Sequence, residues 1–164
     1  MGGNLDTVSA MRQLARARSK DPFVRDFALN ILRSYGVRSH NYKSEALAIG
    51  DYIKNNMRYV RDIDNVERIQ DPLLIIQDIQ AGKGAGDCDD MSLIIATLLL
   101  SIGAQPYFRT VRYFGAAGPY NHIYVVLKDH NHKQKSERIV LDAIVKDKQI
   151  GYEVPHKSGD DYKV

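Results

Sequence analysis

The sequence has no tryptophan and only one cysteine among its 164 residues. A single cysteine excludes an intramolecular disulfide framework and a cysteine-rich zinc site, and it suits a reducing compartment. No stretch reaches the roughly 18 apolar residues of a membrane span. The N-terminus lacks the basic start and apolar stretch of a secretory signal. We therefore expect a soluble protein made inside the cell, with no membrane partner.

Neither sign of charge dominates the chain. The 23 basic and 20 acidic residues are interspersed and give a net charge of +3, a distribution that does not predict nucleic-acid binding. With 44% hydrophobic residues the chain can bury one substantial core, so we expect a single domain over residues 1–164. Within it we expect an N-terminal helical extension (1–43), a core (44–144) and a C-terminal tail (145–164), of which residues 152–164 order only on contact.

The first half of the sequence carries clear start and stop signals for helices. Apolar residues at helical spacing predict a helix over residues 7–18 with a basic outer face. Three further helices are predicted from caps, prolines and glycines: from Asp21-Pro22 to Gly36, from Ser44 to Asn55-Asn56, and from Asp71-Pro72 to Gly82. Between the last two, residues 57–61 predict a short extended segment.

Cys88 stands in Gly86-Asp87-Cys88-Asp89-Asp90, directly before a long apolar run that stops at Gly103. The run predicts a central, largely buried helix that begins at the cysteine, with Asp87 as its N-cap. A helix N-terminus presents unpaired N–H groups and about half a unit of positive charge, which favours a thiolate. On a helical wheel the thiol lies on the apolar side of this helix, so we expect it to face the elements against which the helix packs.

The apolar period changes from 3.6 to 2 in the second half of the chain. Residues 106–113, 120–128 and 138–144 predict three strands of an antiparallel sheet. A hairpin centred on residue 132 pairs residues whose numbers sum to 264, which sets His122 opposite Asp142. Directly opposed side chains lie about 5 Å apart at Cβ and share a face, so Asp142 is positioned to accept a hydrogen bond from the imidazole.

Nucleophilic catalysis by cysteine uses three groups together: a thiol at a helix N-terminus, a histidine and a carboxylate. The imidazole takes the thiol proton and later donates it to the leaving group, and the carboxylate orients the ring. Alone, Cys88 is typical of a small buried hydrophobic residue, and His122 or Asp142 alone is typical of a structural residue. The combination is what predicts a site.

These segments resemble the transglutaminase-like superfamily, whose core is papain-like. The resemblance covers about residues 44–144 and rests on the cysteine motif with its apolar helix, on Asn121-His122-Ile123-Tyr124 and on Leu141-Asp142, preceded by segments 46–53 and 57–60. Residues 61–62 and 67–72 are most similar to short members encoded by tailed bacteriophages and prophages. The resemblance implies an α+β fold, with N-terminal helices and a cysteine-bearing central helix on a small antiparallel sheet, and a triad of Cys88, His122 and Asp142.

The sequence departs from its relatives beside the nucleophile. Asp89 stands where animal transglutaminases have tryptophan, which counts against cross-linking. Asp87, Asp89 and Asp90 oppose ionisation of the thiol, so a cationic His122 has to outweigh them. The family's oxyanion site combines the cysteine N–H with an upstream donor, for which the candidates are Tyr59, Gln77 and Gln80.

Three functions stay open. The favoured one is a cysteine peptidase or amidase that acts on peptide or isopeptide bonds through a thioester. The second is transglutaminase-type cross-linking, and the third is a non-catalytic assembly protein of a phage particle that docks through Arg12, Arg16, Arg18 and residues 152–164. The expected partners are a protein or peptide substrate and, in the third case, a virion, and the expected location is the bacterial cytoplasm or the virion.

No cofactor or metal is expected. Residues 129–132, which contain His130 and His132, are typical of a polar hairpin loop because no third ligand has a fixed spacing. Residues 62–65 lack the glycine and closing glutamate of a calcium loop. The glycines at 82–86 lack the ending of a phosphate-binding loop and more simply allow a tight turn that leaves room for substrate.

Overall fold

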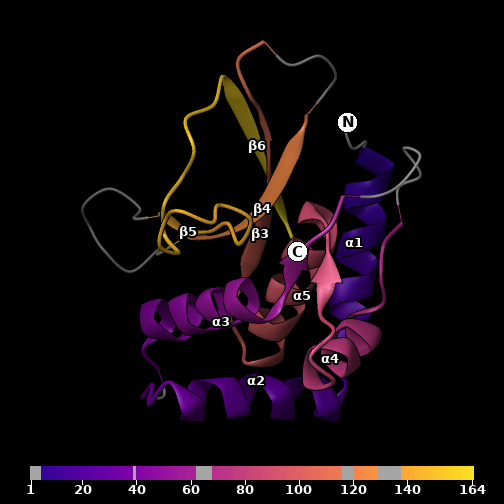
Figure 1. Ribbon diagram of the computed structural model, residues 1–164, viewed down its shortest axis with the longest axis vertical. Helices are drawn as coiled ribbons and strands as arrows, with labels where there is room; N and C mark the ends of the chain where they lie inside the picture. The colour runs from indigo at the N-terminus through magenta and orange to yellow at the C-terminus, as the bar shows by residue number, and fades with distance from the viewer. Residues whose placement is uncertain (1–4, 39, 62–67, 116–119, 129–137) are drawn as a thin grey trace.

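The apolar helix predicted after Cys88 forms the centre of the fold as α5, Cys88–Ser101. Every residue from Asp89 to Leu99 is buried, because α5 packs against four helices and against two strands of a sheet. A helix that is apolar nearly all round requires such neighbours. The structure is a computed structural model that describes residues 5–38, 40–61, 68–115, 120–128 and 138–164 (Figure 1). Among the helices of these ranges none has the length and apolarity to cross a membrane.

Four helices surround α5, and their limits follow the sequence signals. They are α1 (Leu5–Arg18), α2 (Pro22–Ser34), α3 (Tyr42–Asn56) and α4 (Pro72–Gln80). The predicted starts at Asp-Pro are confirmed: Asp21 and Asp71 accept hydrogen bonds from the N–H groups of Phe23 and Leu73, both at 2.9 Å. Figure 1 shows α2 and α3 below the sheet and α1 upright beside α5.

The third helix begins earlier than predicted. Asn41, not Ser44, is its N-cap, and the Asn41 Oδ1 accepts the N–H of Ser44 at 3.2 Å. Asparagine and serine are almost equally good N-caps. Either residue can cap a helix, and the structure uses Asn41.

The predicted change of period marks a four-stranded antiparallel sheet. In spatial order its strands are β5 (Arg138–Leu141), β4 (His122–Lys128), β3 (Pro106–Arg112) and β6 (Ser158–Lys163). The first three correspond to the predicted strands, although β5 ends at Leu141 rather than at residue 144. Alternate side chains of β4 pack toward α5 or on the outer face of the sheet, as the period of two requires.

The fourth strand corrects the expectation that the C-terminal tail orders only on contact with a partner. Residues 158–163 contain no apolar run, yet β6 pairs with β3 along its length. Asp161 forms salt bridges with Arg109 at 2.8 Å and with Lys128 at 3.0 Å, and Val164 is buried. Backbone pairing and ionic contacts, rather than an apolar face, hold this strand in the sheet.

The arginines of α1 that were expected to dock on a partner contact the chain itself. Arg12 Nε donates to the carbonyl of Lys163 at 2.7 Å, and Arg16 reaches the same oxygen at 3.5 Å. Arg18 forms a salt bridge with Asp71 at the start of α4. These side chains connect α1 to β6 and α4.

Candidate active site

The peptide before Cys88 is held by a two-stranded parallel ribbon. β1 (Arg58–Tyr59) lies in the predicted extended segment and pairs with β2 (Ala85–Gly86). The N–H of Val60 donates to the carbonyl of Gly86 at 2.9 Å. The ribbon fixes how the chain enters α5, and it brings Tyr59 beside that entry.

Asp87 caps α5 one residue before the thiol, as predicted. Its Oδ1 accepts the N–H groups of Asp89 at 3.0 Å and Asp90 at 3.2 Å, and the Asp90 carboxylate accepts the N–H of Asp87 at 3.3 Å. These reciprocal bonds form a capping box. Gln70 supports it from outside the helix, because its backbone N–H and its side-chain amide each donate to the Asp90 carboxylate at 2.9 Å.

Gly86 leaves no room for a side chain at this turn. A Cβ at Gly86 would lie 2.6 Å from Cβ and 2.7 Å from Oδ2 of Asp90. The glycine therefore allows the close approach between β2 and the capping carboxylate that the turn into α5 requires.

His122 and Asp142 form a buried hydrogen bond. His122 Nε2 lies 2.7 Å from Asp142 Oδ2, and the two residues are only 2% and 3% exposed. The N–H of Ile144 donates to the other carboxylate oxygen, Oδ1, at 3.3 Å. Asp142 thus has partners on both oxygens, and the ring nitrogen of His122 left for a further partner is Nδ1.

The register that brings this pair together differs from the predicted one by two residues. Val125 lies opposite Leu141 and Lys128 opposite Arg138, so paired numbers sum to 266 rather than 264. A shift of two keeps each side chain on its face of the sheet. Asp142, directly after β5, is therefore diagonal to His122 rather than opposite it, and diagonal neighbours remain within reach of long side chains.

The thiol of Cys88 lies against the start of β4. The backbone N–H of Ile123, the residue after His122, donates a hydrogen bond to the sulfur, and the charge of Asp142 acts on the thiol as well. Cys88 is partly buried and is the free cysteine of the chain. The structure thus brings the start of α5, the start of β4 and the end of β5 to one point.

The electrostatics of Cys88 oppose a lone thiolate. Burial raises the pKa of the thiol far above its ordinary value, and the carboxylates of Asp89 and Asp87 raise it further. Asp89 Oδ1 lies 3.9 Å from the sulfur. The N–H of Ile123 lowers the pKa but is outweighed. Without a cationic partner this cysteine is a thiol at neutral pH.

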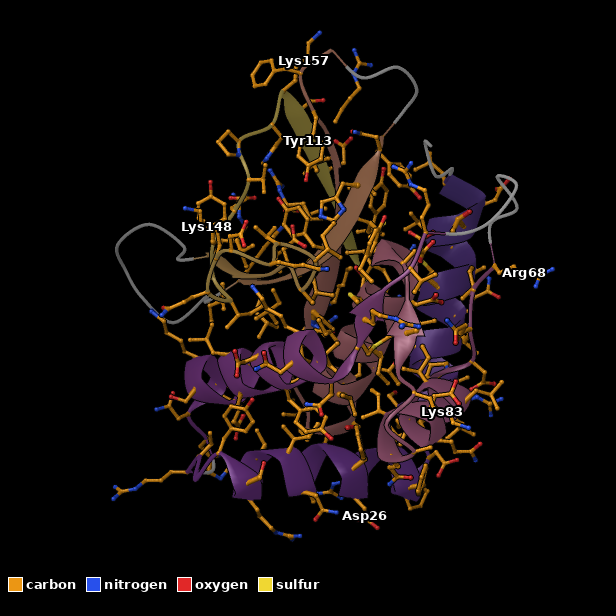
Figure 2. The ribbon with its side chains drawn as sticks, viewed as in Figure 1. Asp26, Arg68, Lys83, Tyr113, Lys148 and Lys157 are labelled. Atoms are coloured by element: carbon orange, nitrogen blue, oxygen red, sulfur yellow. The ribbon has the colours of Figure 1, made fainter. Side chains whose placement is uncertain are left out.

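Two tyrosines that had no predicted role in the site flank the imidazole. The ring of Tyr113 stacks on the ring of His122, with centroids 5.8 Å apart and an angle of 21° between the planes. The ring of Tyr124 is tilted relative to the imidazole, with centroids 5.5 Å apart. Burial raises the pKa of Tyr113, and the nearby charges of Asp142 and Cys88 raise it further. The two rings restrict rotation of the imidazole. Figure 2 shows Tyr113 at the sheet end of the molecule, opposite Asp26 of α2.

The three oxyanion candidates occupy different surroundings. Tyr59 lies beside the thiol: burial raises its pKa, and the charge of Cys88 adds to the rise. Its phenol therefore stays protonated and able to donate. Gln77 and Gln80 are exposed on α4.

A cavity of about 270 Å³ adjoins the site. Tyr59 lines it, as do Met91, one turn after Cys88 on α5, and Ala143, directly after Asp142. Residues close in sequence to Cys88 and to Asp142 thus form part of its wall.

Within the described residues no three histidine, cysteine, aspartate or glutamate side chains gather as metal ligands. The segments considered for metal at the sequence level, 62–65 and 129–132, lie outside those residues.

Comparison with known proteins reveals likeness in fold rather than in sequence. No protein-family model and no curated protein matches the chain. Among solved structures, the chain is similar to a Cytophaga hutchinsonii protein proposed to be a cysteine protease, with TM-score 0.50 and 19% identity over 74% of this chain and 38% of that one. It is also similar to calcium-bound Legionella pneumophila LapG, with TM-score 0.50 and 18% identity over 85% of this chain and 74% of that one.

These neighbours agree with the predicted fold class. The chain has the α+β, papain-like and transglutaminase-like fold, with a cysteine-bearing central helix packed on a small antiparallel sheet. It spans 38% of the length of the Cytophaga protein. The expected relation to phage proteins stays a prediction.

Proposed function

We propose that the protein is a cysteine peptidase or amidase that cleaves peptide or isopeptide bonds through Cys88, His122 and Asp142. The observation that carries the proposal is the buried 2.7 Å hydrogen bond from His122 to Asp142 beside a thiol at the N-terminus of α5. It is supported by the likeness in fold to the Cytophaga protein, which is itself proposed to be a cysteine protease. The hydrogen bond satisfies both residues in the interior, where unpaired burial of either is costly.

The first half of the reaction forms a thioester. Nδ1 of His122 takes the proton of the Cys88 thiol, and the sulfur attacks the carbonyl carbon of the substrate. The C–N bond then breaks as the imidazolium gives that proton to the leaving amine. Asp142 stabilises the imidazolium and holds the ring, and the positive charge of the imidazolium offsets the unfavourable carboxylates around the thiol.

The second half releases the acyl group. His122 takes a proton from water, the resulting oxygen attacks the thioester carbonyl, and the C–S bond breaks to give a carboxylic acid and the thiol. In each half the carbonyl oxygen becomes an anion. The N–H of Cys88, at the first position of α5, and the phenol of Tyr59 are the donors that we assign to it.

The test is the rate of Cys88 alkylation by iodoacetamide across pH. Ion-pair formation with His122 gives a reactive thiolate near neutral pH, so the wild-type protein should be alkylated there. His122→Ala should lose that reaction and be alkylated only above the ordinary thiol pKa of about 8.5. His156→Ala is the matched control, because His156 contacts Arg109 rather than the site. A wild-type rate that rises only above that pH, and is unchanged in His122→Ala, would refute the proposal.

Hydrolysis and cross-linking share the thioester and differ in what resolves it. Incubation with glutamine-containing peptides, with and without a labelled primary amine, separates them by mass spectrometry. We expect deamidated or cleaved product and little amine incorporation. Predominant incorporation would assign transglutamination instead.

A further inference from the structure

The 270 Å³ cavity lined by Tyr59 has a distinct chemical lining. Its apolar residues are Met57, Met91, Ala143 and Ile144, and its other residues are Tyr59, Asn55 and two lysines, Lys54 and Lys146. Its described lining contains no aspartate or glutamate. A lining that combines apolar and cationic side chains fits a side chain that has a short hydrocarbon stem and a negatively charged end.

Lys54 is held toward the cavity by the chain itself. Its ammonium donates to the backbone carbonyls of Val145 and Lys148. An ammonium has three donors, so one N–H remains for a ligand while the other two fix the position of the nitrogen. The flexible stem of lysine is thereby ordered before a ligand arrives, which lowers the entropic cost of binding.

Asp51, the acidic residue one turn before Lys54, has hydrogen-bond partners in other, neutral side chains. Asp51 Oδ2 accepts hydrogen bonds from the hydroxyl of Tyr35 at 2.7 Å and from the amide of Asn55 at 3.0 Å. The second cation, Lys146, is exposed, so it is available to a ligand that enters from solvent.

We propose that this cavity is a substrate subsite for an acidic side chain, glutamate above all, next to the bond that Cys88 attacks. The inference rests on the proposed function, because Tyr59, Met91 and Ala143 connect the cavity to the residues of the site. The carboxylate lies between Lys54 and Lys146, and the methylene groups pack on the methionines. Peptides that present glutamate at this position are therefore the preferred substrates.

Binding to the Cys88→Ala protein tests the subsite without relying on catalysis. The ¹⁵N-labelled variant is titrated with three matched peptides, Ac-Gly-Glu-Gly-NH₂ and its glutamine and lysine counterparts, and amide shifts are followed by NMR. We expect saturable shifts at Met57, Met91 and Ala143, with the glutamate peptide bound about fivefold more tightly than the glutamine peptide and the lysine peptide bound least. Lys146→Glu should abolish the preference for glutamate.

Lys157→Glu is the control for overall charge. Lys157 is exposed, directly before β6 and outside the cavity lining (Figure 2). It should leave the preference intact. Equal affinity for the three peptides, no saturable shift, or equal loss in both lysine variants would overturn the subsite. The alkylation profile of the wild-type protein reports separately on the proposed function.

Discussion

His122 Nε2 lies 2.7 Å from Asp142 Oδ2, and neither side chain is more than 3% exposed. This hydrogen bond is buried, so water does not compete for it. The other oxygen of the carboxylate is held by the N–H of Ile144. The imidazole therefore has one orientation. When the ring is neutral its proton belongs on Nε2, because a carboxylate only accepts. Nδ1 is then the basic nitrogen.

Replacement of Asp142 tests whether this residue activates the thiol by orienting the imidazole or by its negative charge. An asparagine oxygen can still accept from Nε2–H, as in the Cys-His-Asn sites of papain-like proteases. We expect Asp142→Asn to alkylate at neutral pH within about tenfold of the wild-type rate, since a charge-assisted hydrogen bond is roughly twice as strong as a neutral one. Asp142→Ala should fall to the His122→Ala rate. The measurement is the iodoacetamide rate at fixed pH, with circular dichroism to verify folding. Equal rates for the alanine variant and the wild type would show that Asp142 has no part in activation.

Gly86→Ala tests whether the turn into α5 positions the thiol. The added Cβ would overlap Asp90, and overpacking of this kind costs about 1–3 kcal/mol of unfolding free energy. We expect lower stability in denaturant and slower alkylation of Cys88. Gly36→Ala is the control, because Gly36 has a positive φ of 63° but no atom within 4 Å of an added Cβ. It should lose stability without changing alkylation. If both variants alkylate alike, the turn has no role in the site.

The stability of the sheet should fall in acid through two carboxylates. Burial alone would raise the pKa of Asp161 and of Glu153. Hydrogen bonds from Arg109 and Lys128 to Asp161, and from Tyr124 and Arg138 to Glu153, outweigh burial and lower both values. A lowered folded-state pKa contributes stability that is present above the ordinary values of 3.8 and 4.5 and is lost as pH falls through the folded-state pKa.

Denaturant unfolding from about pH 6 to about pH 3 measures this loss. Asp161→Asn should be less stable at the upper end and should depend less on pH than the wild type. Asp147→Asn, at an exposed position outside the network, should follow the wild-type curve. Identical pH slopes for wild type and Asp161→Asn would exclude the network as the cause.

Much of the fold could be predicted because strong local signals mark its elements. Asp-Pro starts two helices, and the unbroken apolar run after Cys88 requires a central helix. The predicted contact between His122 and Asp142 is present although the predicted register was wrong by two residues. A shift of two residues keeps each side chain on the same face of its strand. The sequence between the two strands, residues 129–137, has no turn signal that fixes the centre of a hairpin.

The rest depends on contacts between distant segments. β6 is stabilised by Arg109 and Lys128, which belong to other strands. Its own residues carry no strand pattern, so the sequence predicts a polar tail. Tyr113 lies nine residues before His122 in sequence and is placed on the ring only by the pairing of β3 with β4. The cavity lining comes from α3, β1, α5 and the segment after β5, and no local pattern unites them.

The burial of α5 on every side has a practical consequence. Core helices open only when the whole domain unfolds, so the first turn that carries Cys88 is anchored to the most persistent part of the molecule. The environment of the sulfur should therefore vanish in the same transition as the fold. Alkylation at neutral pH then serves as a gauge of native protein, readable in a mixture without any substrate.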